Sequence, residues 1–529
     1  MSGTVASWIL RRAQSKSLTV SCGQHRLYSR INRPPPRPVS RPRRIRAARS
    51  SSSSSPEFND GRAPSSQRQS SLEKVDFRLT GAQINGLLRA NEQNVRIPEF
   101  DGRGLSPVLR FESNQLPANA PNEDRRSVAT CLQTKGMLFG VFDGHGGHAC
   151  AQAVSERLLY YIAVALMPRQ SLEEIEYAME NTKPVPPILQ WYKHHNDYIY
   201  RESASLYVDH LRVFWQELLE NEEHGDGMDP LDALAYAFRR LDADISLEAQ
   251  VPLDSELMRS TAIQVAFAGS TACLAHVDME GILVANAGDC RAVLGVQEED
   301  GSWSALPLSR DHNARNVAEL ARLRSQHPKA EEATVVQDER LLGILMPFRA
   351  FGDVRFKWSK ELQQSVLENS CDLDSLDIYQ YTPANFHTPP YLEVTPELTY
   401  HRLRPKDRFL ILASDGLWDM LSDDEAVRLA AEHLTGVHLQ APVSASERQM
   451  NLGQMHSLLL HRCAVPSLDL NSATHLIRHA VGTNEYGELD QERLSAMLAL
   501  PDDLARMYRD DITVTIVYFN SDLAKARED

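Results

Sequence analysis

The 529-residue sequence predicts an α+β fold in which antiparallel strands and helices form separate layers. In residues 269–308, apolar segments alternate with the polar turns DMEG and EEDGS, as in an antiparallel meander of three strands. Helical periodicity comes before and between the strand groups and does not follow every strand. This order favours a layered α+β fold over a parallel doubly wound sheet.

The N-terminal segment differs in composition from the rest of the chain. Residues 1–56 contain eleven Arg, one Lys and no Asp or Glu. An acid-free leader rich in Arg and Ser is typical of a mitochondrial transit peptide, and a disordered basic tail is the alternative interpretation. Proline-rich and serine-rich stretches follow, as in a linker. We therefore expect residues 1–72 to be a transit peptide and disordered linker.

Residues 73–525 are expected to form one domain. Apolar side chains recur every three or four residues from Cys150 to Ala165, which predicts a helix directly after a glycine-rich turn. Periodicity also predicts helices over 231–248 and 314–325, and buried strands over 409–416 and 511–519. Stretches of loops and peripheral helices are expected as insertions near 168–230, 325–395 and 435–500.

Charge and cysteine content narrow the function classes. Residues 57–529 hold 44 of the 56 basic side chains and all 71 acidic ones, a net charge of −27 that argues against a nucleic-acid partner. No run of about eighteen apolar residues occurs, so no membrane span is expected. The seven cysteines form no C-x-x-C pair, which indicates reduced thiols in an intracellular or organellar setting.

Aspartates lie at the ends of strand-like runs at several distant points of the sequence. The segments are PNEDRR (121–126), VFDGHGG (141–147), NAGDCRAVL (286–294), LASDGLWD (412–419) and RDDITVTIV (509–517). A single Asp-Gly pair is usually a turn former. Together, however, carboxylates held at strand ends predict a cluster of oxygen ligands, which suits Mg²⁺ or Mn²⁺ better than Zn²⁺.

The segment FGVFDGHGGHAC, residues 139–150, surrounds one carboxylate and one imidazole with glycines. Glycine lets the backbone approach a metal closely enough for a carbonyl oxygen to become a ligand. His145, beside such a site, is predicted to be a general acid, with a structural hydrogen-bonding role as the alternative.

Six short motifs carry a resemblance to a known family. EDRR, FGVFDGHGG, NAGDCR, RAFGD, ASDGLWD and RDDITV, in this order, resemble the PPM-type, or type 2C, metal-dependent protein serine/threonine phosphatases. The resemblance spans about Arg110 to Phe519 and implies a central sandwich of two antiparallel β-sheets flanked by helices, with metals at one end. Residues 73–525 would then be the catalytic domain.

The resemblance also implies roles for individual residues. Asp143 and His145 are the expected catalytic residues, His145 as the general acid. The ligands of two Mg²⁺ or Mn²⁺ ions and a weaker third would be Asp143 as the bridge, Gly144 through its carbonyl oxygen, Asp415 and Asp510 at the first ion, Glu123 and Asp124 at the second, and Asp289 and Asp419 at the third.

One position departs from the family pattern. Many members carry a phosphate-binding arginine four residues before the glutamate of the ED pair, and here that residue is Asn119. Asparagine is neutral, so we expect weaker phosphate binding. Arg125 or Arg126 could compensate, although a solvated surface pair is the favoured interpretation of both.

Longer strings, such as RFESNQLPANAPNEDRRSVATC and DDLARMYRDDITVTIVYFN, resemble a mitochondrial branch of the family. That resemblance implies a matrix enzyme that removes phosphate from phosphoserine on the pyruvate dehydrogenase component of the pyruvate dehydrogenase complex and so reactivates it. It also implies docking on a lipoyl domain of the acyltransferase core and a regulatory subunit. The alternatives are a matrix phosphatase for another phosphoprotein, such as a branched-chain dehydrogenase, and a catalytically silent scaffold.

Overall fold

The computed structural model describes residues 78–97, 106–197, 204–221, 225–251, 256–368, 383–436, 453 and 469–522. The chain divides into two units, Met1–Lys74 and Val75–Asp529, and every described residue belongs to the second. The predicted transit peptide and linker lie outside the described residues. No helix in the described part of the chain is long and apolar enough to span a membrane.

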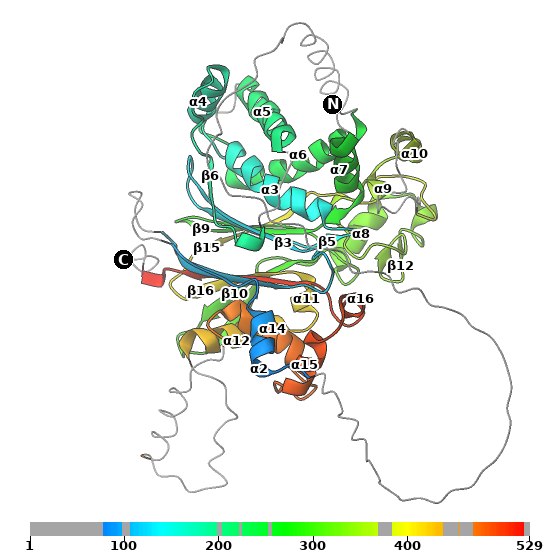
Figure 1. The fold of residues 1–529 in the computed structure, drawn as a ribbon. Helices are drawn as coiled ribbons and strands as arrows, with labels where there is room; N and C mark the ends of the chain where they lie inside the picture. Colours follow the sequence, from blue (N-terminus) through cyan, green and yellow to red (C-terminus); the bar gives the residue numbers. More distant parts are fainter. Residues whose placement is uncertain are drawn as a thin grey trace, which may run out of the picture. The chain divides into compact units, whose positions relative to one another are not determined.

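Two six-stranded sheets lie at the centre of the described residues (Figure 1). All neighbouring strands in them are antiparallel. The first sheet has the spatial order β1 (Gln93–Arg96), β2 (Val108–Leu116), β17 (Ile512–Phe519), β16 (Asp407–Ala413), β10 (Arg291–Gln297) and β11 (Trp303–Pro307). The second has the order β15 (Glu397–Arg402), β9 (Gly281–Ala287), β8 (Ala272–Val277), β4 (Met137–Phe142), β3 (Arg125–Cys131) and β6 (Leu189–Trp191).

The two sheets pack face to face. Apolar side chains of both sheets, among them Phe111, Phe139 and Leu410, form one buried cluster between them. Burying one face of each sheet in this way removes the apolar half of every strand from water. The predicted α+β sandwich of two antiparallel sheets is therefore confirmed.

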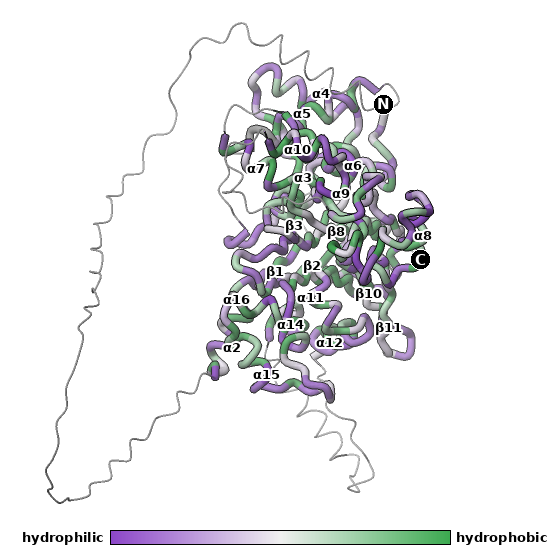
Figure 2. The backbone as a smooth tube through the Cα atoms, turned by 90° about the vertical axis from the view of Figure 1, so that its right-hand side faces the viewer, coloured by the Kyte–Doolittle hydropathy of each residue, from purple (hydrophilic) through white to green (hydrophobic). Residues whose placement is uncertain are grey.

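Helices cover both outer faces of the sandwich (Figure 1). Against the second sheet lie α3 (Ala149–Ala165), α4 (Arg169–Glu180), α5 (Ala204–Glu220), α6 (Pro230–Gln250) and α7 (Glu256–Phe267). Against the first lie α2 (Gly81–Leu88), α11 (Asp415–Trp418), α12 (Asp423–Thr435), α14 (Ser472–Gly482) and α15 (Gln491–Leu498). Figure 2 shows hydrophobic segments concentrated between these layers and hydrophilic segments along the outer edge.

The predicted helices and strands are largely confirmed. Cys150, Val154, Leu158, Tyr161 and Ala165 are all buried in α3, as their spacing predicts. The helix expected over 231–248 is α6, which begins after the N-cap Asp229 with proline at its first position. The remaining expected elements correspond to α8 (Val317–Gln326), β16 and β17.

The predicted meander over 269–308 is wrong in its middle strand. What reads as one apolar segment divides into β9 and β10 at Gly288, whose φ is +122°. β9 stays in the second sheet, whereas β10 belongs to the first. A side chain at position 288 would place its Cβ 2.3 Å from the Cβ of Thr271, so glycine is required at this crossover. The crossover carries Asp289 to one end of the sandwich.

A small sheet lies at that end of the sandwich. A three-stranded sheet joins β14 (Phe351–Gly352), β7 (Gly269–Ser270) and β5 (Gly144–His145). The remaining short elements are η1 (His195–Asp197), η2 (Lys329–Glu331), β12 (Val336–Gln337), β13 (Arg340–Leu341), α9 (Val354–Lys357), α10 (Lys360–Glu368) and α16 (Asp502–Ala505). Leu323, Phe348 and Tyr391 contribute to a separate apolar cluster beneath α8 and the loops around it.

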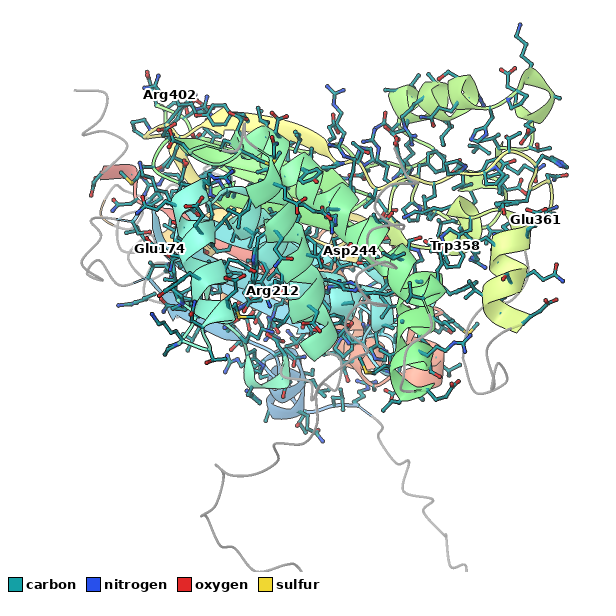
Figure 3. All side chains as sticks on the ribbon, turned by 90° about the horizontal axis from the view of Figure 1, so that it is seen from above. Glu174, Arg212, Asp244, Trp358, Glu361 and Arg402 are labelled. Carbon is teal, nitrogen blue, oxygen red and sulfur yellow. The ribbon has the colours of Figure 1, made fainter. Side chains whose placement is uncertain are left out.

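Buried polar pairs hold α3 in its layer. Arg157 of α3 donates two hydrogen bonds to Glu248 of α6, at 3.0 and 2.6 Å, and Tyr161 donates to Asp244 at 2.5 Å. Figure 3 looks down on this layer and shows Asp244 within it and Glu361 at its periphery on α10. Because α3 follows the glycine-rich turn directly, these pairs also help to position the turn.

Candidate metal centre

Three aspartates distant in sequence converge at the end of the sandwich. Asp143, Asp289 and Asp415 each offer a carboxylate oxygen, and these atoms all lie within 4.8 Å of one another. Asp143 follows β4, Asp289 lies in the crossover between β9 and β10, and Asp415 begins α11 directly after β16. Each carboxylate is thus held at the end of a sheet strand, and two of the three strands belong to the second sheet.

The backbone at Gly144 leaves no room for a side chain. A Cβ at that position would lie 2.5 Å from the carbonyl oxygen of Glu123 and 2.9 Å from the Cβ of Ala151. Gly146 and Gly147 follow with φ of +65° and +105°, which only glycine adopts readily. The turn between β4 and α3 is therefore tight because of its glycines, as the sequence predicts.

We call the cavity over the three aspartates the metal cavity. It has a volume of about 500 Å³, and its lining includes Asp143, Gly144, His145, Asp289, Asp415, Asp510 and Arg506. A second cavity of about 800 Å³ adjoins it at His145, Gly146 and Arg506, which line both. Asn119 and Glu123 line only the second cavity.

The negative charge of the buried aspartates in the metal cavity exceeds the positive charge of the side chains around them. Burial and the neighbouring carboxylates raise the pKa values of Asp143 and Asp289 well above the usual range. Burial and the charge of Asp510 raise the pKa of Asp415 to about 7. Concentrated negative charge of this kind is stabilised by a bound cation.

Two orphaned oxygens support a cation site. Among the described residues, Oδ1 of Asp415 and Oδ1 of Asp124 are buried without a hydrogen-bond partner. Buried carboxylate oxygens are normally paired or coordinate a metal. The donors present here are oxygens, which Mg²⁺ and Mn²⁺ prefer. The residues therefore fit a divalent hard cation.

The structure places the other predicted ligands around this cluster. Asp510 lines the metal cavity, and Asp419 lines a small cavity beside Asp289 and Asp415. Glu123 accepts a hydrogen bond from the Gly147 N–H at 2.7 Å. Asp124 is only 1% exposed, and its Oδ2 accepts a bond from Ser414 Oγ at 2.7 Å. Their individual roles as ligands stay predictions.

His145 has a partner that the sequence did not predict. Its Nε2 lies 2.5 Å from Oδ2 of Asp353, the last residue of the RAFGD motif. Burial alone would lower the pKa of His145, but the charge and hydrogen bond of Asp353 outweigh it and raise that pKa. Asp353 has a φ of +48°, strained for an aspartate, and β14 and β7 bring it next to β5. The motif itself was the available signal, although no spacing links it to His145.

The second residue of the pair Asp510-Asp511 holds a loop. Asp511 is 2% exposed and accepts hydrogen bonds from the N–H groups of Ala118, Asn119 and Glu123, at 2.5, 2.9 and 2.8 Å. The side-chain amide of Asn119 also donates to Asp511, at 2.9 Å. Asn119 therefore supports this loop.

The favoured interpretation of Arg125 and Arg126 as a solvated surface pair is wrong. Arg126 is 6% exposed and donates to Asn91 O at 2.9 Å and Ser113 Oγ at 3.1 Å. Arg125 is half-buried and donates to the backbone oxygens of Asn122 and Asp124, each at 2.7 Å. Both guanidinium groups hold neighbouring segments together.

Comparison with known proteins decides the family. A model described as protein phosphatase 2C matches residues 192–455. Human mitochondrial [pyruvate dehydrogenase [acetyl-transferring]]-phosphatase 2 is 55% identical over 532 residues, which cover 99% of this chain and 98% of that protein. The chain belongs to the protein phosphatase 2C family. The resemblance inferred from six motifs is thus confirmed.

Further proteins are also similar to this chain. Human mitochondrial [pyruvate dehydrogenase [acetyl-transferring]]-phosphatase 1 is 57% identical over 455 residues, 85% of each chain. A protein phosphatase 2C homolog of Schizosaccharomyces pombe is 31% identical and covers 80% of this chain and 87% of its own. A solved serine-threonine phosphatase 2C from Toxoplasma gondii matches 81% of this chain and 99% of its own, with a TM-score of 0.39 and 18% identity. The family depends on Mg²⁺ or Mn²⁺, in line with the oxygen donors found here.

Proposed function

We propose that the protein is a metal-dependent protein serine/threonine phosphatase that removes phosphate from phosphoserine on the pyruvate dehydrogenase component of the mitochondrial pyruvate dehydrogenase complex, and so reactivates the complex. The metal-dependent chemistry is supported by the convergence of Asp143, Asp289 and Asp415, whose carboxylate oxygens lie within 4.8 Å of one another. The substrate is supported by relatives 55% and 57% identical that are named for it. Because these relatives are named mitochondrial, the protein acts in the mitochondrial matrix.

The proposal includes two Mg²⁺ or Mn²⁺ ions and a weaker third. Asp143 would be the ligand shared by the first two, Gly144 would contribute its carbonyl oxygen, and the other ligands would be Asp415, Asp510, Glu123, Asp124, Asp289 and Asp419. When bound, such ions would supply a water molecule of lowered pKa as the nucleophile and would offset the charge of the phosphate. Rigid strand ends hold the carboxylates in place for this.

His145 supplies the proton in this proposal. With Nε2 bonded to Asp353, the remaining ring nitrogen, Nδ1, holds the proton that passes to the departing serine oxygen. Asp353 keeps the ring oriented and the imidazolium stable, as a carboxylate does for a catalytic histidine elsewhere. The substrate reaches these groups through the metal cavity and the cavity beside it.

Domain organisation and partners are further parts of the proposal. Residues 1–72 serve as transit peptide and linker, and residues 73–525 form the catalytic domain with insertions near 168–230, 325–395 and 435–500. The chain docks on a lipoyl domain of the acyltransferase core, together with a regulatory subunit. Support for these partners comes from the resemblance to the mitochondrial branch alone. Activity on the phosphorylated complex should rise when lipoyl domain is present.

The test is hydrolysis by the purified protein with Mg²⁺ or Mn²⁺. The substrates are the phosphorylated pyruvate dehydrogenase complex and, as the comparison, the phosphorylated branched-chain dehydrogenase complex. We expect phosphate release and recovered dehydrogenase activity with the first, and little release with the second. Equal rates would point to a broader matrix phosphatase. If the protein released no phosphate from any phosphoester in the presence of metal, the alternative of a catalytically silent scaffold would be supported.

A further inference from the structure

The two adjoining cavities expose few positive groups to a phosphate. Asn119 has its side-chain amide bonded to Asp511 at 2.9 Å. Arg340 lines only the metal cavity and donates to the carbonyl oxygen of Ile344 at 3.0 Å, and Arg355 is only 9% exposed. Arg506, by contrast, has a half-exposed side chain and lines both cavities.

Arg506 is held over the acidic cluster by its own segment. It follows α16, which lies at the same end of the sandwich as α11 and β5 (Figure 1). Its guanidinium forms an ion pair with Asp510, one turn further along the chain. Its charge acts most strongly on Asp510, and also on Asp415 and Asp143. A guanidinium has five N–H donors in a planar fork, so one carboxylate contact leaves donors available for a second anion.

The position of Arg506 affects the charge balance of the site. The proposed ligands include seven carboxylates, and three divalent cations would leave one of their seven negative charges unbalanced. A phosphate monoester with two negative charges would then meet a site without net attraction. Arg506, which lines both cavities, supplies that attraction and a bidentate contact as well.

We propose that Arg506 binds the phosphoryl group of the substrate through two parallel N–H···O contacts, an inference that rests on the phosphatase function proposed above. The competing role is that Arg506 only neutralises Asp510. The two roles predict different results for Arg506→Gln. Loss of a phosphate contact weakens phosphate binding and leaves metal binding intact or tighter, because a cation is removed beside a cation site. Loss of mere neutralisation changes metal binding and leaves phosphate binding as it was.

The experiment measures inorganic phosphate binding to the manganese-loaded protein by calorimetry, together with manganese binding alone. The variants are Arg506→Gln, Arg506→Lys and the control Arg428→Gln. Arg428 is a matched arginine, because it also pairs with a carboxylate four residues later, Glu432, and its side chain is 45% exposed against 52% for Arg506. KM and kcat for a phosphoserine peptide give a second measurement.

We expect Arg506→Gln to weaken phosphate binding and raise KM by about tenfold or more, with Arg506→Lys between it and the wild type and Arg428→Gln unchanged. Wild-type phosphate affinity and KM in Arg506→Gln would overturn the inference. A comparable fall in manganese affinity would overturn it too, because Arg506 would then position Asp510. Failure of the wild-type protein to hydrolyse the peptide would instead refute the proposed function itself.

Discussion

At the scale of single residues, the carboxylate of Asp143 has four acidic neighbours that act on its charge. Its pKa is raised by burial and by Asp415, Asp124, Asp289 and Asp510, so the folded protein bears repulsion there. Folding normally avoids such a cluster, and its presence indicates selection for a site rather than for stability.

Asp143→Asn should separate catalysis from stability. We expect activity on a phosphoserine peptide to fall by about three orders of magnitude, because a bridging charge is lost. Without metal, the variant should melt at the same temperature as the wild type or higher, since one repelling charge is gone. Full activity at saturating Mg²⁺ would refute the bridging role, and a lower melting temperature would refute the repulsion.

His145 and Asp353 should behave as a pair. His145→Gln and Asp353→Asn should each lower the rate on a phosphoserine peptide by about 10²-fold or more. The rate on p-nitrophenyl phosphate should fall much less, because its leaving group needs little protonation. Equal losses on both substrates would remove His145 from the role of acid, and an unaffected Asp353→Asn would show that the contact is not needed.

At the scale of elements, the crossover from β9 to β10 depends on one glycine. Gly288→Ala should destabilise the protein by about 2 kcal/mol or more, because φ is +122° and the new Cβ would meet Thr271. Gly301→Ala is the matched control. It also has a positive φ, +82°, but nothing lies within 4 Å of the added Cβ. Urea unfolding measures both, and equal losses would contradict the role of the contact.

An ion pair connects α8 to the RAFGD segment, and its contribution to stability depends on pH. Glu319 accepts bonds from Arg349 and Arg322; burial opposes its charge, yet these arginines lower its pKa to about 2. A lowered pKa stabilises the fold above the unfolded value of about 4.3, and this contribution disappears as pH falls toward 2.

Glu319→Gln should therefore cost about 1–2 kcal/mol of stability at pH 7, after allowance for solvent screening. The difference from the wild type should shrink between about pH 4.5 and 2. Chemical unfolding at several pH values measures it. A difference that stays constant over this range would show that the carboxylate charge contributes nothing.

At the scale of the whole molecule, the metal cavity joins strands of both sheets. Asp289 and Asp143 extend from the second sheet, while Asp415 and Asp510 flank β16 and β17 of the first. A cation bound among them would link the two halves of the sandwich and offset their repulsion.

Manganese should therefore raise the melting temperature, and a chelator should reverse the rise. Binding at a hundred times the dissociation constant stabilises a folded protein by about 2.7 kcal/mol. Asp415→Asn, which removes one of the three converging carboxylates, should reduce the rise. An equal rise in Asp415→Asn would place the metal elsewhere.

Much of this protein could be predicted from local patterns. Apolar spacing was enough for α3 and α6, because a helix buries one face whatever its neighbours are. Aspartates at the ends of strand-like runs predicted the acidic cluster, since such positions are held rigidly. Periodicity failed at Gly288, where both halves of an apolar segment are buried and no change of period marks the crossing between sheets.

The amino-acid sequence alone determined the α+β class, the acidic character of the site and the oxygen donors that it offers, because residue type and spacing act locally. Only the tertiary structure decided which partners meet: Asp353 beside His145, Asp511 under Asn119, and Arg506 over Asp510. The first two contacts join residues more than two hundred positions apart, and the third depends on which way a short exposed turn faces. The proximity of the first two pairs arises from the packing of sheets and helices, which no spacing along the chain records.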